Sequence, residues 1–141
     1  MTTETSSEAI RSLIARLAQL ADEGSVADYA QLYTEDAVWE MLGVVQTGLS
    51  PHTSRGREAI AASACDRRAA GIAGPGTQTR HVTTCVSIAF DSEEAARAES
   101  VWQFFVDTTT APRLSGIGRY HDIFVKIDGR WLLAKRSITN G

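Results

Sequence analysis

Residues 118–137 read GRYHDIFVKIDGRWLLAKRS, and the dipeptide Asp128-Gly129 separates two runs rich in apolar and β-branched residues. An Asp-Gly pair between such runs is a strong signal for a two-residue hairpin turn, because both turn positions need a positive φ angle. The sequence therefore predicts two long antiparallel strands, 114–127 and 130–138.

Two further strands are expected upstream of this hairpin. Residues 80–90 alternate with a period of two, and residues 95–106 form a second long run that pairs with them through a turn near 91–93. Strict alternation predicts one face made of Val82, Val86, Ile88 and Phe90, and an opposite face made of His81, Thr83, Cys85, Ser87 and Ala89.

The N-terminal half is predicted to be mostly helical. Thr5 and Glu8 have capping-box spacing, so the first helix is expected to begin near residue 5 or 6 and to end at Gly24. Ser25 can cap a second helix that runs to Asp36. A short strand at 37–41, a loop at 42–55 and a third helix from 56 to about 70 follow. The apolar face of the first helix comprises Ile10, Leu13, Ile14, Leu17, Leu20 and Ala21.

Helices followed by antiparallel strands define an α+β class, and 141 residues fit one domain, 1–141.

The net charge of −3 and the scattered arginines argue against a nucleic-acid partner. No apolar run reaches the roughly 20 residues of a membrane span, and the start does not resemble a signal peptide. We therefore expect a cytoplasmic protein with no membrane partner. Its two cysteines, Cys65 and Cys85, are expected to be buried free thiols.

Three stretches together resemble the SnoaL-like, or nuclear-transport-factor-like, superfamily. They are ADEGSVADYAQLYTEDAVWE (21–40), SRGREAIAA (54–62) and the hairpin at 118–137. The resemblance covers nearly the whole chain. It implies a cone-shaped, curved antiparallel sheet wrapped around the N-terminal helices and enclosing a pocket. Members include scytalone dehydratase, polyketide cyclases, a dehydrochlorinase, oxygenase small subunits and binding modules, so the resemblance specifies the fold better than the reaction.

The resemblance also implies a catalytic pair, His81 and Asp22. Both fall where scytalone dehydratase and the dehydrochlorinase carry their catalytic histidine and aspartate. An imidazole ionises near neutral pH, and a carboxylate on its second nitrogen fixes the tautomer. The residues alone leave alternatives open. The helical wheel places Asp22 roughly 130° from the apolar face, in solvent, and His81 could simply bond to backbone.

Other positions depart from the scytalone dehydratase pattern. Its second catalytic histidine aligns with Trp102, its site tyrosines with Ala21 and Met41, and its site asparagine with Tyr120. The resemblance therefore implies a different substrate.

Pairing across the Asp128-Gly129 turn predicts a further contact, the cross-strand pair Asp122–Lys135, with Arg136 on the opposite face beside His121. His52 is expected to be exposed in its loop. The histidines have no neighbouring ligands at metal-site spacing, so neither a metal nor another cofactor is expected.

These observations lead to one hypothesis and one alternative. The hypothesis is a cofactor-free lyase or isomerase, similar to a dehydratase or cyclase, acting on a small, mostly apolar, cyclic carbonyl compound. His81 is the base or acid, Asp22 orients it, and Tyr120 polarises a substrate oxygen. The alternative is a non-catalytic ligand-binding or accessory domain, such as an oxygenase small subunit. The side chains expected to line the pocket and bind the substrate are Tyr33, Trp39, Met41, Trp102 and Phe104.

Apolar residues on both faces of the strands also predict a homodimer or homotrimer. Its interface would be the outer sheet face, with Val82, Val86, Ile88, Ile123 and Val125.

Overall fold

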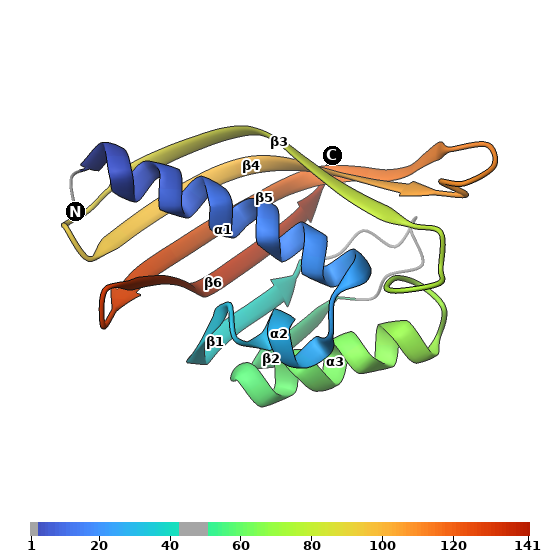
Figure 1. Cartoon of the computed structure of the whole chain (residues 1–141), viewed down its shortest axis with the longest axis horizontal. Helices are drawn as coiled ribbons and strands as arrows, with labels where there is room; N and C mark the ends of the chain where they lie inside the picture. The colour runs from blue at the N-terminus through green and yellow to red at the C-terminus, as the bar shows by residue number, and fades with distance from the viewer. Residues whose placement is uncertain (1–2, 43–50) are drawn as a thin grey trace.

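The computed structural model describes residues 3–42 and 51–141, and it has the α+β fold with a curved sheet that the sequence predicts (Figure 1). Six strands form one sheet in the order β2-β1-β6-β5-β4-β3, in which β1 and β6 are parallel and all other neighbours are antiparallel. The elements are α1 (Thr3–Glu23), α2 (Val26–Ala30), β1 (Tyr33–Met41), β2 (His52–Arg55), α3 (Arg57–Ala69), β3 (Arg80–Phe90), β4 (Ala95–Val106), β5 (Arg113–Ile127) and β6 (Arg130–Asn140).

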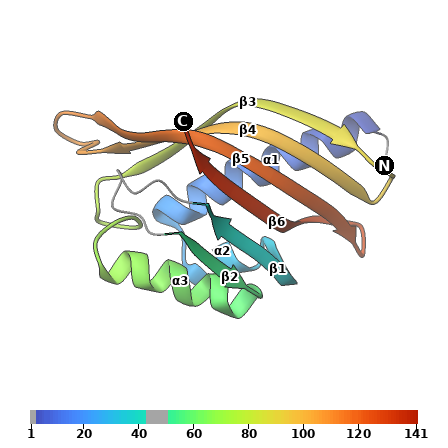
Figure 2. The same cartoon turned by 180° about the vertical axis from the view of Figure 1, so that it is seen from behind.

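Helix α1 crosses one face of the sheet, and α3 lies beside β1 and β2. Viewed from behind, the strands lie in front of α1, and no helix of the described chain covers their outer face (Figure 2). The core lies between α1 and the concave face of the sheet. Its largest fully buried side chains are Tyr33, Phe124, Ile10, Leu17, Ile60 and Leu133.

Two local signals are confirmed, the Asp128-Gly129 turn and the Ser25 cap. Asp128 and Gly129 have φ angles of 50° and 78°, which is the positive-φ pair that a tight hairpin requires. Ser25 caps α2 by accepting a hydrogen bond from the Asp28 amide at 3.1 Å. Each of these signals depends only on residues that are neighbours along the chain.

Several predicted boundaries are wrong. Helix α1 begins at Thr3, before the predicted start, and α2 ends at Ala30, so that β1 already begins at Tyr33. Residues 52–55, predicted as loop, form β2 because they pair with β1 through the register Met41↔His52. Residues 43–50 of that predicted loop lie outside the described part of the chain.

A β-bulge reverses the faces of β3. Cys85 has a φ of 53°, and the pairing with β4 shifts between Thr84 and Ser87. One extra residue moves every later side chain to the other face of a strand. Val86, Ile88 and Phe90 therefore pack against the core, and the prediction that Val86 and Ile88 lie on the outer face is wrong. The prediction of buried thiols is also wrong, because Cys65 and Cys85 are exposed.

A second bulge shifts the pairing of β5 with β6. Phe124 pairs with Leu133 but Ile123 pairs with Lys135, so one residue of β6 is skipped. The shift places Arg136, not Lys135, opposite Asp122, and the predicted Asp122–Lys135 pair is wrong.

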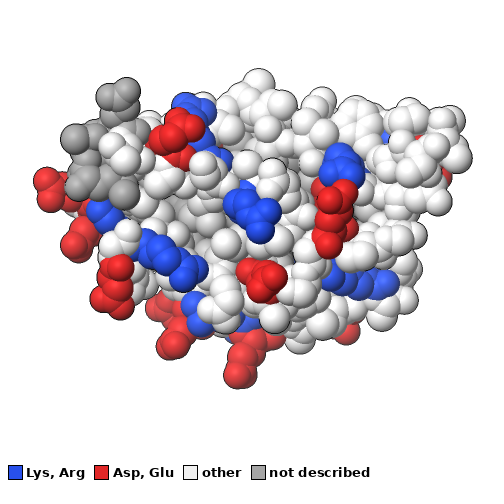
Figure 3. Space-filling view, in the orientation of Figure 1, with Lys and Arg blue, Asp and Glu red and all other residues white. Residues whose placement is uncertain are grey.

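The surface carries mixed charge. Acidic and basic side chains are interspersed over the face shown in Figure 3, without a continuous basic patch. Within the described residues, no helix combines the length and the apolar character that crossing a bilayer requires.

Trp102 packs tightly against β5 and provides a test of the fold. Its Nε1 donates a hydrogen bond to the Thr139 carbonyl at 3.1 Å, and a Cβ placed on Gly118 would lie only 2.7 Å from the ring. We expect Trp102→Ala to lower the free energy of unfolding by about 3–5 kcal/mol, because it leaves a cavity. Trp102→Phe keeps most of the volume and is expected to lose less. Chemical denaturation measures both, and an unchanged stability for Trp102→Ala would mean that the ring is not packed.

Candidate active site

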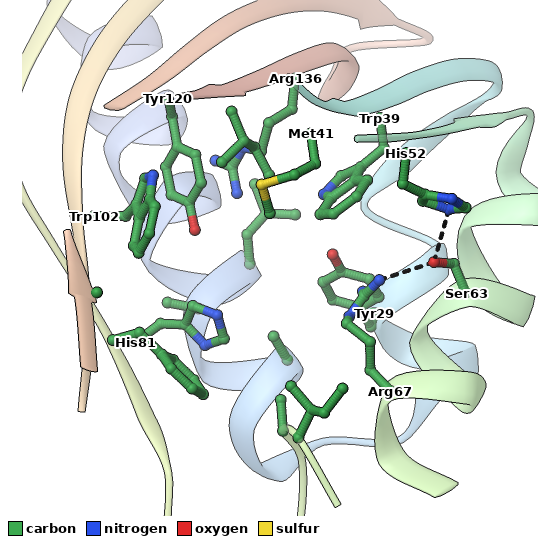
Figure 4. A pocket seen from close by; sticks show the side chains of 18 of the residues that line it. Tyr29, Trp39, Met41, His52, Ser63, Arg67, His81, Trp102, Tyr120 and Arg136 are labelled. Atoms are coloured by element: carbon green, nitrogen blue, oxygen red, sulfur yellow. Dashed lines mark hydrogen bonds between the residues drawn. The ribbon is translucent and has the colours of Figure 1, made fainter. Parts of the chain in front are cut away.

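A cavity of about 600 Å³ lies between α1, α3 and the concave face of the sheet (Figure 4). Its walls are mainly apolar, with polar side chains gathered on opposite sides of the view. Small-molecule sites typically combine an apolar wall with a few convergent polar groups in this way. The principal lining residues are Leu17, Tyr29, Trp39, Met41, His52, Ser63, Arg67, His81, Trp102, Phe104, Tyr120, Arg136 and Ile138.

His81 and Asp22 meet at one side of this cavity. Asp22 Oδ1 lies 2.7 Å from His81 Nδ1, and Asp22 Oδ2 accepts a hydrogen bond from the His81 backbone N–H at 2.9 Å. Asp22 is 3% exposed, whereas the His81 side chain is 23% exposed and lines the cavity. Because the carboxylate accepts the Nδ1 proton, Nε2 of the neutral ring is unprotonated and is free of partners among the described residues.

The burial of Asp22 contradicts the helical wheel. The wheel considers only the face of α1 that packs on the core, but β3 approaches the last turn of α1 from another side. A carboxylate near a helix C-terminus is electrostatically unfavourable. Here the two donors from His81 compensate, and Arg68 donates from Nη2 to the Leu20 carbonyl at 3.0 Å.

A second polar group, formed by Tyr120, Arg136 and Asp122, lies on β5 and β6. Arg136 donates from Nε and Nη2 to the two Asp122 oxygens at 2.8 and 2.9 Å, and both residues are buried. The guanidinium carbon lies 3.7 Å from the centroid of the Tyr120 ring. Asp122 thus balances the charge of Arg136, which a buried arginine requires.

The Tyr120 hydroxyl points into the cavity (Figure 4). Burial raises the pKa of Tyr120 to about 12, an effect that the Arg136 charge opposes. The hydroxyl therefore stays protonated at neutral pH and can donate a hydrogen bond to an oxygen in the cavity.

A third polar group, on β2 and α3, occupies the opposite wall. Ser63 Oγ lies 3.2 Å from His52 Nε2 and accepts a hydrogen bond from Arg67 Nη1 at 2.9 Å. The Arg67 guanidinium also lies over the Trp39 ring, 4.9 Å from its centroid. His52 is exposed, as expected, but it also lines the cavity.

The structure brings together most of the predicted site residues. His81, Tyr120, Trp39, Met41, Trp102 and Phe104 all line the cavity, and Asp22 lies directly behind His81. Tyr33 does not line it. Tyr33 is completely buried, its hydroxyl lies 2.6 Å from that of Tyr29, and Tyr29 forms the wall in its place.

Sequence reasoning missed Arg136, Arg67 and Ser63. The bulge in β6 moved Arg136 to the inner face, and nothing in the local sequence marks a bulge there. Ser63 and Arg67 are four residues apart and therefore share one helix face, a spacing that could have linked them. The described residues contain no cluster of three His, Cys, Asp or Glu side chains suited to a metal ion.

The comparisons identify the family. The model of the SnoaL-like domain matches residues 3–137, so the chain belongs to the SnoaL-like family. No curated protein shows significant sequence similarity to it.

Solved structures agree with this assignment. A protein of unknown function from Mycobacterium tuberculosis is 26% identical over 97% of this chain and 72% of its own, with a TM-score of 0.76. A "putative scytalone dehydratase" from Novosphingobium aromaticivorans is 25% identical over 97% and 85%, with a TM-score of 0.71. From the same organism, the beta subunit of a "putative aromatic-ring-hydroxylating dioxygenase" is 17% identical over 97% and 90%, with a TM-score of 0.77. The last of these is a likeness of fold alone.

The raised pKa of Tyr120 gives a prediction for alkaline pH. Tyrosine ionises near 10 in the unfolded chain but only near 12 in the folded protein. Between these values the folded state binds more protons, so the free energy of unfolding should fall as pH rises from 10 to 12. Tyr33, whose pKa burial also raises, adds to the same slope.

Tyr120→Phe should make that slope shallower. Urea unfolding at several pH values between 9 and 12 measures it. An unchanged slope in Tyr120→Phe would contradict the assigned environment of the hydroxyl.

Proposed function

We propose that this protein is a cofactor-free lyase or isomerase that acts on a small, mostly apolar, cyclic carbonyl compound. The observation that carries the proposal is the 2.7 Å contact between Asp22 and His81 Nδ1, with the other ring nitrogen open to an apolar cavity. A base held in one tautomer by a buried carboxylate is the arrangement that proton abstraction requires.

The proposed first step is removal of a proton from the carbon next to the substrate carbonyl. His81 Nε2 takes the proton, and the electron pair of the broken C–H bond moves onto the carbonyl oxygen to give an enolate. The Asp22 carboxylate stabilises the imidazolium, and the neutral Tyr120 hydroxyl donates a hydrogen bond to the enolate oxygen.

Two outcomes are then open from the same intermediate. In an elimination, the enolate expels a leaving group from the β-carbon, and the imidazolium can protonate a departing hydroxide. In an isomerisation of a β,γ-unsaturated ketone, the enolate is conjugated with the C=C bond; His81 returns the proton to the γ-carbon, and the double bond moves to the α,β position. The apolar side chains of Trp39, Met41, Trp102 and Phe104 favour a ring-shaped substrate body.

The accessory-domain alternative is supported by one observation, the fold shared with a dioxygenase beta subunit. In that case the cavity would bind a ligand without chemical change or would have no ligand, and His81 would have no chemical role. The two functions differ in whether His81 governs a proton transfer.

We expect the protein to exchange the α-protons of a cyclic ketone with solvent deuterium, which requires no knowledge of the natural substrate. 2-Tetralone in D₂O, followed by NMR, is a suitable probe. His81→Ala should slow enzymatic exchange by about 10²–10⁴-fold. His121→Ala is the matched control, because this histidine lies on the outer face, 43% exposed.

Asp22→Asn should slow exchange steeply while leaving probe affinity nearly unchanged. An amide can donate to His81 Nδ1, which forces the ring proton onto Nε2 and removes the base. The double variant should be scarcely worse than His81→Ala, because the two residues act as one unit. Full exchange activity in His81→Ala would remove the pair from the mechanism. If several cyclic ketones bind but their α-protons do not exchange with solvent deuterium, the result would favour the accessory-domain alternative.

A homodimer or homotrimer through the outer sheet face is a separate proposal. Ile123 is 43% exposed there, and Ile117 on the same strand is 42% exposed. Of the residues first assigned to this interface, Val82, Ile123 and Val125 remain on the outer face, whereas Val86 and Ile88 do not. A cytoplasmic location likewise stays a prediction.

We expect Ile123→Glu to shift the assembly toward monomer, because a carboxylate would be buried without a partner. Native mass spectrometry at micromolar concentration measures the shift, with Glu93→Gln, an exposed position in the turn between β3 and β4, as the control. A wild-type protein that is already monomeric would contradict the interface.

A further inference from the structure

The cavity has two polar sides separated by apolar walls. His81 and Tyr120 lie on one side, and Arg67, Ser63 and His52 lie on the other (Figure 4). The proposed chemistry uses only the first side. The second side contains a positive charge with no assigned role.

Arg67 forms no ion pair with a described carboxylate, although its chain neighbour Asp66 also lines the cavity. Its side chain donates to Ser63 and lies over Trp39, and within the described residues no acidic oxygen approaches it within 4.0 Å. The sequence of residues 43–50 contains neither Asp nor Glu. Arg136 differs, since Asp122 satisfies it with two hydrogen bonds. A half-buried guanidinium that makes no ion pair with a described carboxylate is a favourable site for an anion.

Arg67 is also held in place for such a ligand. Ser63, one turn earlier on α3, accepts a hydrogen bond from Arg67 Nη1, and its Oγ lies 3.2 Å from His52 Nε2, which also lies 2.8 Å from Ser54 Oγ. The Trp39 ring supports one face of the guanidinium. These contacts leave the other guanidinium N–H groups available for the paired oxygens of a carboxylate, whose planar geometry they match.

We propose that Arg67, Ser63 and His52 form a carboxylate-binding subsite on the wall opposite His81. The ligand is then a flat, apolar ring acid that spans the cavity, with its carboxylate at Arg67. The further statement that its carbonyl end lies at His81 rests on the proposed function. A cavity of about 600 Å³ lies within the usual range for a ligand of two or three rings.

The test compares two bicyclic probes of nearly equal shape, 2-naphthoate and its neutral amide, 2-naphthamide. Isothermal titration or quenching of tryptophan fluorescence gives both affinities, since Trp39 and Trp102 line the cavity. We expect wild-type protein to bind the carboxylate about 10- to 100-fold more tightly than the amide, the range for a charge-assisted hydrogen bond. Arg67→Gln should reduce the ratio to near one without weakening amide binding.

Two control variants separate this subsite from other effects. Arg97→Gln removes an equal charge from an exposed pair with Asp91 and should keep the full preference. His81→Ala should also keep the preference for the carboxylate over the amide. The subsite can therefore be supported even if the proposed proton transfer by His81 is disproved. Ser63→Ala should lower the affinity for the carboxylate several-fold. If Arg67→Gln does not fold, Ser63→Ala still tests whether carboxylate binding depends on this group of residues.

Three results would overturn the subsite. One is equal affinity of wild-type protein for carboxylate and amide. Another is a preference that survives in both Arg67→Gln and Ser63→Ala, which would assign anion binding to a different group. The third is no binding of either probe at millimolar concentration.

Discussion

The two hydrogen bonds that Asp22 accepts from His81 join the end of α1 to the start of β3, and much of the molecule depends on them. A buried carboxylate needs partners for both oxygens, and leaving a buried polar group without a partner costs about 1–3 kcal/mol. Here one oxygen is satisfied by backbone and the other by an imidazole. The first contact fixes where the helix meets the strand, and the second fixes which ring nitrogen is open to the cavity. The same side chain therefore contributes to stability and, in the proposed function, to reactivity.

The strands and turns were predictable because their signals are local. The alternation in residues 80–90 and 95–106 and the Asp128-Gly129 pair led to strands with correct bounds or nearly so. The faces of those strands were not predictable throughout. The bulges at Cys85 and before Lys135 each insert one residue, and a bulge depends on pairing with a distant strand. Arg136 was missed for that reason, and β2 was missed because only β1 makes it a strand. The position of Asp22 came from the family resemblance, since the helical wheel pointed to solvent.

The cavity illustrates how one fold supports different chemistries. The chain shares its architecture with a dehydratase-like protein and with an oxygenase beta subunit, yet function depends on a few side chains that project inward. In this chain they include two arginines in opposite electrostatic situations. Arg136 is neutralised by Asp122 and stiffens the wall under Tyr120, whereas Arg67 retains its charge. Because the surrounding walls are mainly apolar, the field of a guanidinium that forms no ion pair with a described carboxylate extends further than it would in water.

The parallel pairing of β1 with β6 has a consequence for the route by which the chain folds. Strands β3 to β6 can assemble as successive hairpins, each closing a short loop. β1 joins the sheet only beside β6, and the Ser137–Glu40 hydrogen bond between them spans 97 residues. Contacts between residues so far apart raise the contact order and slow folding, because the entropy of closing a long loop is lost before the contact forms. We expect the four-strand meander to form early and the docking of β1, with α2 and α3 beside it, to limit the rate. Until that step, the half of the cavity that carries Trp39 does not exist, so ligand capture should report the last stage of folding.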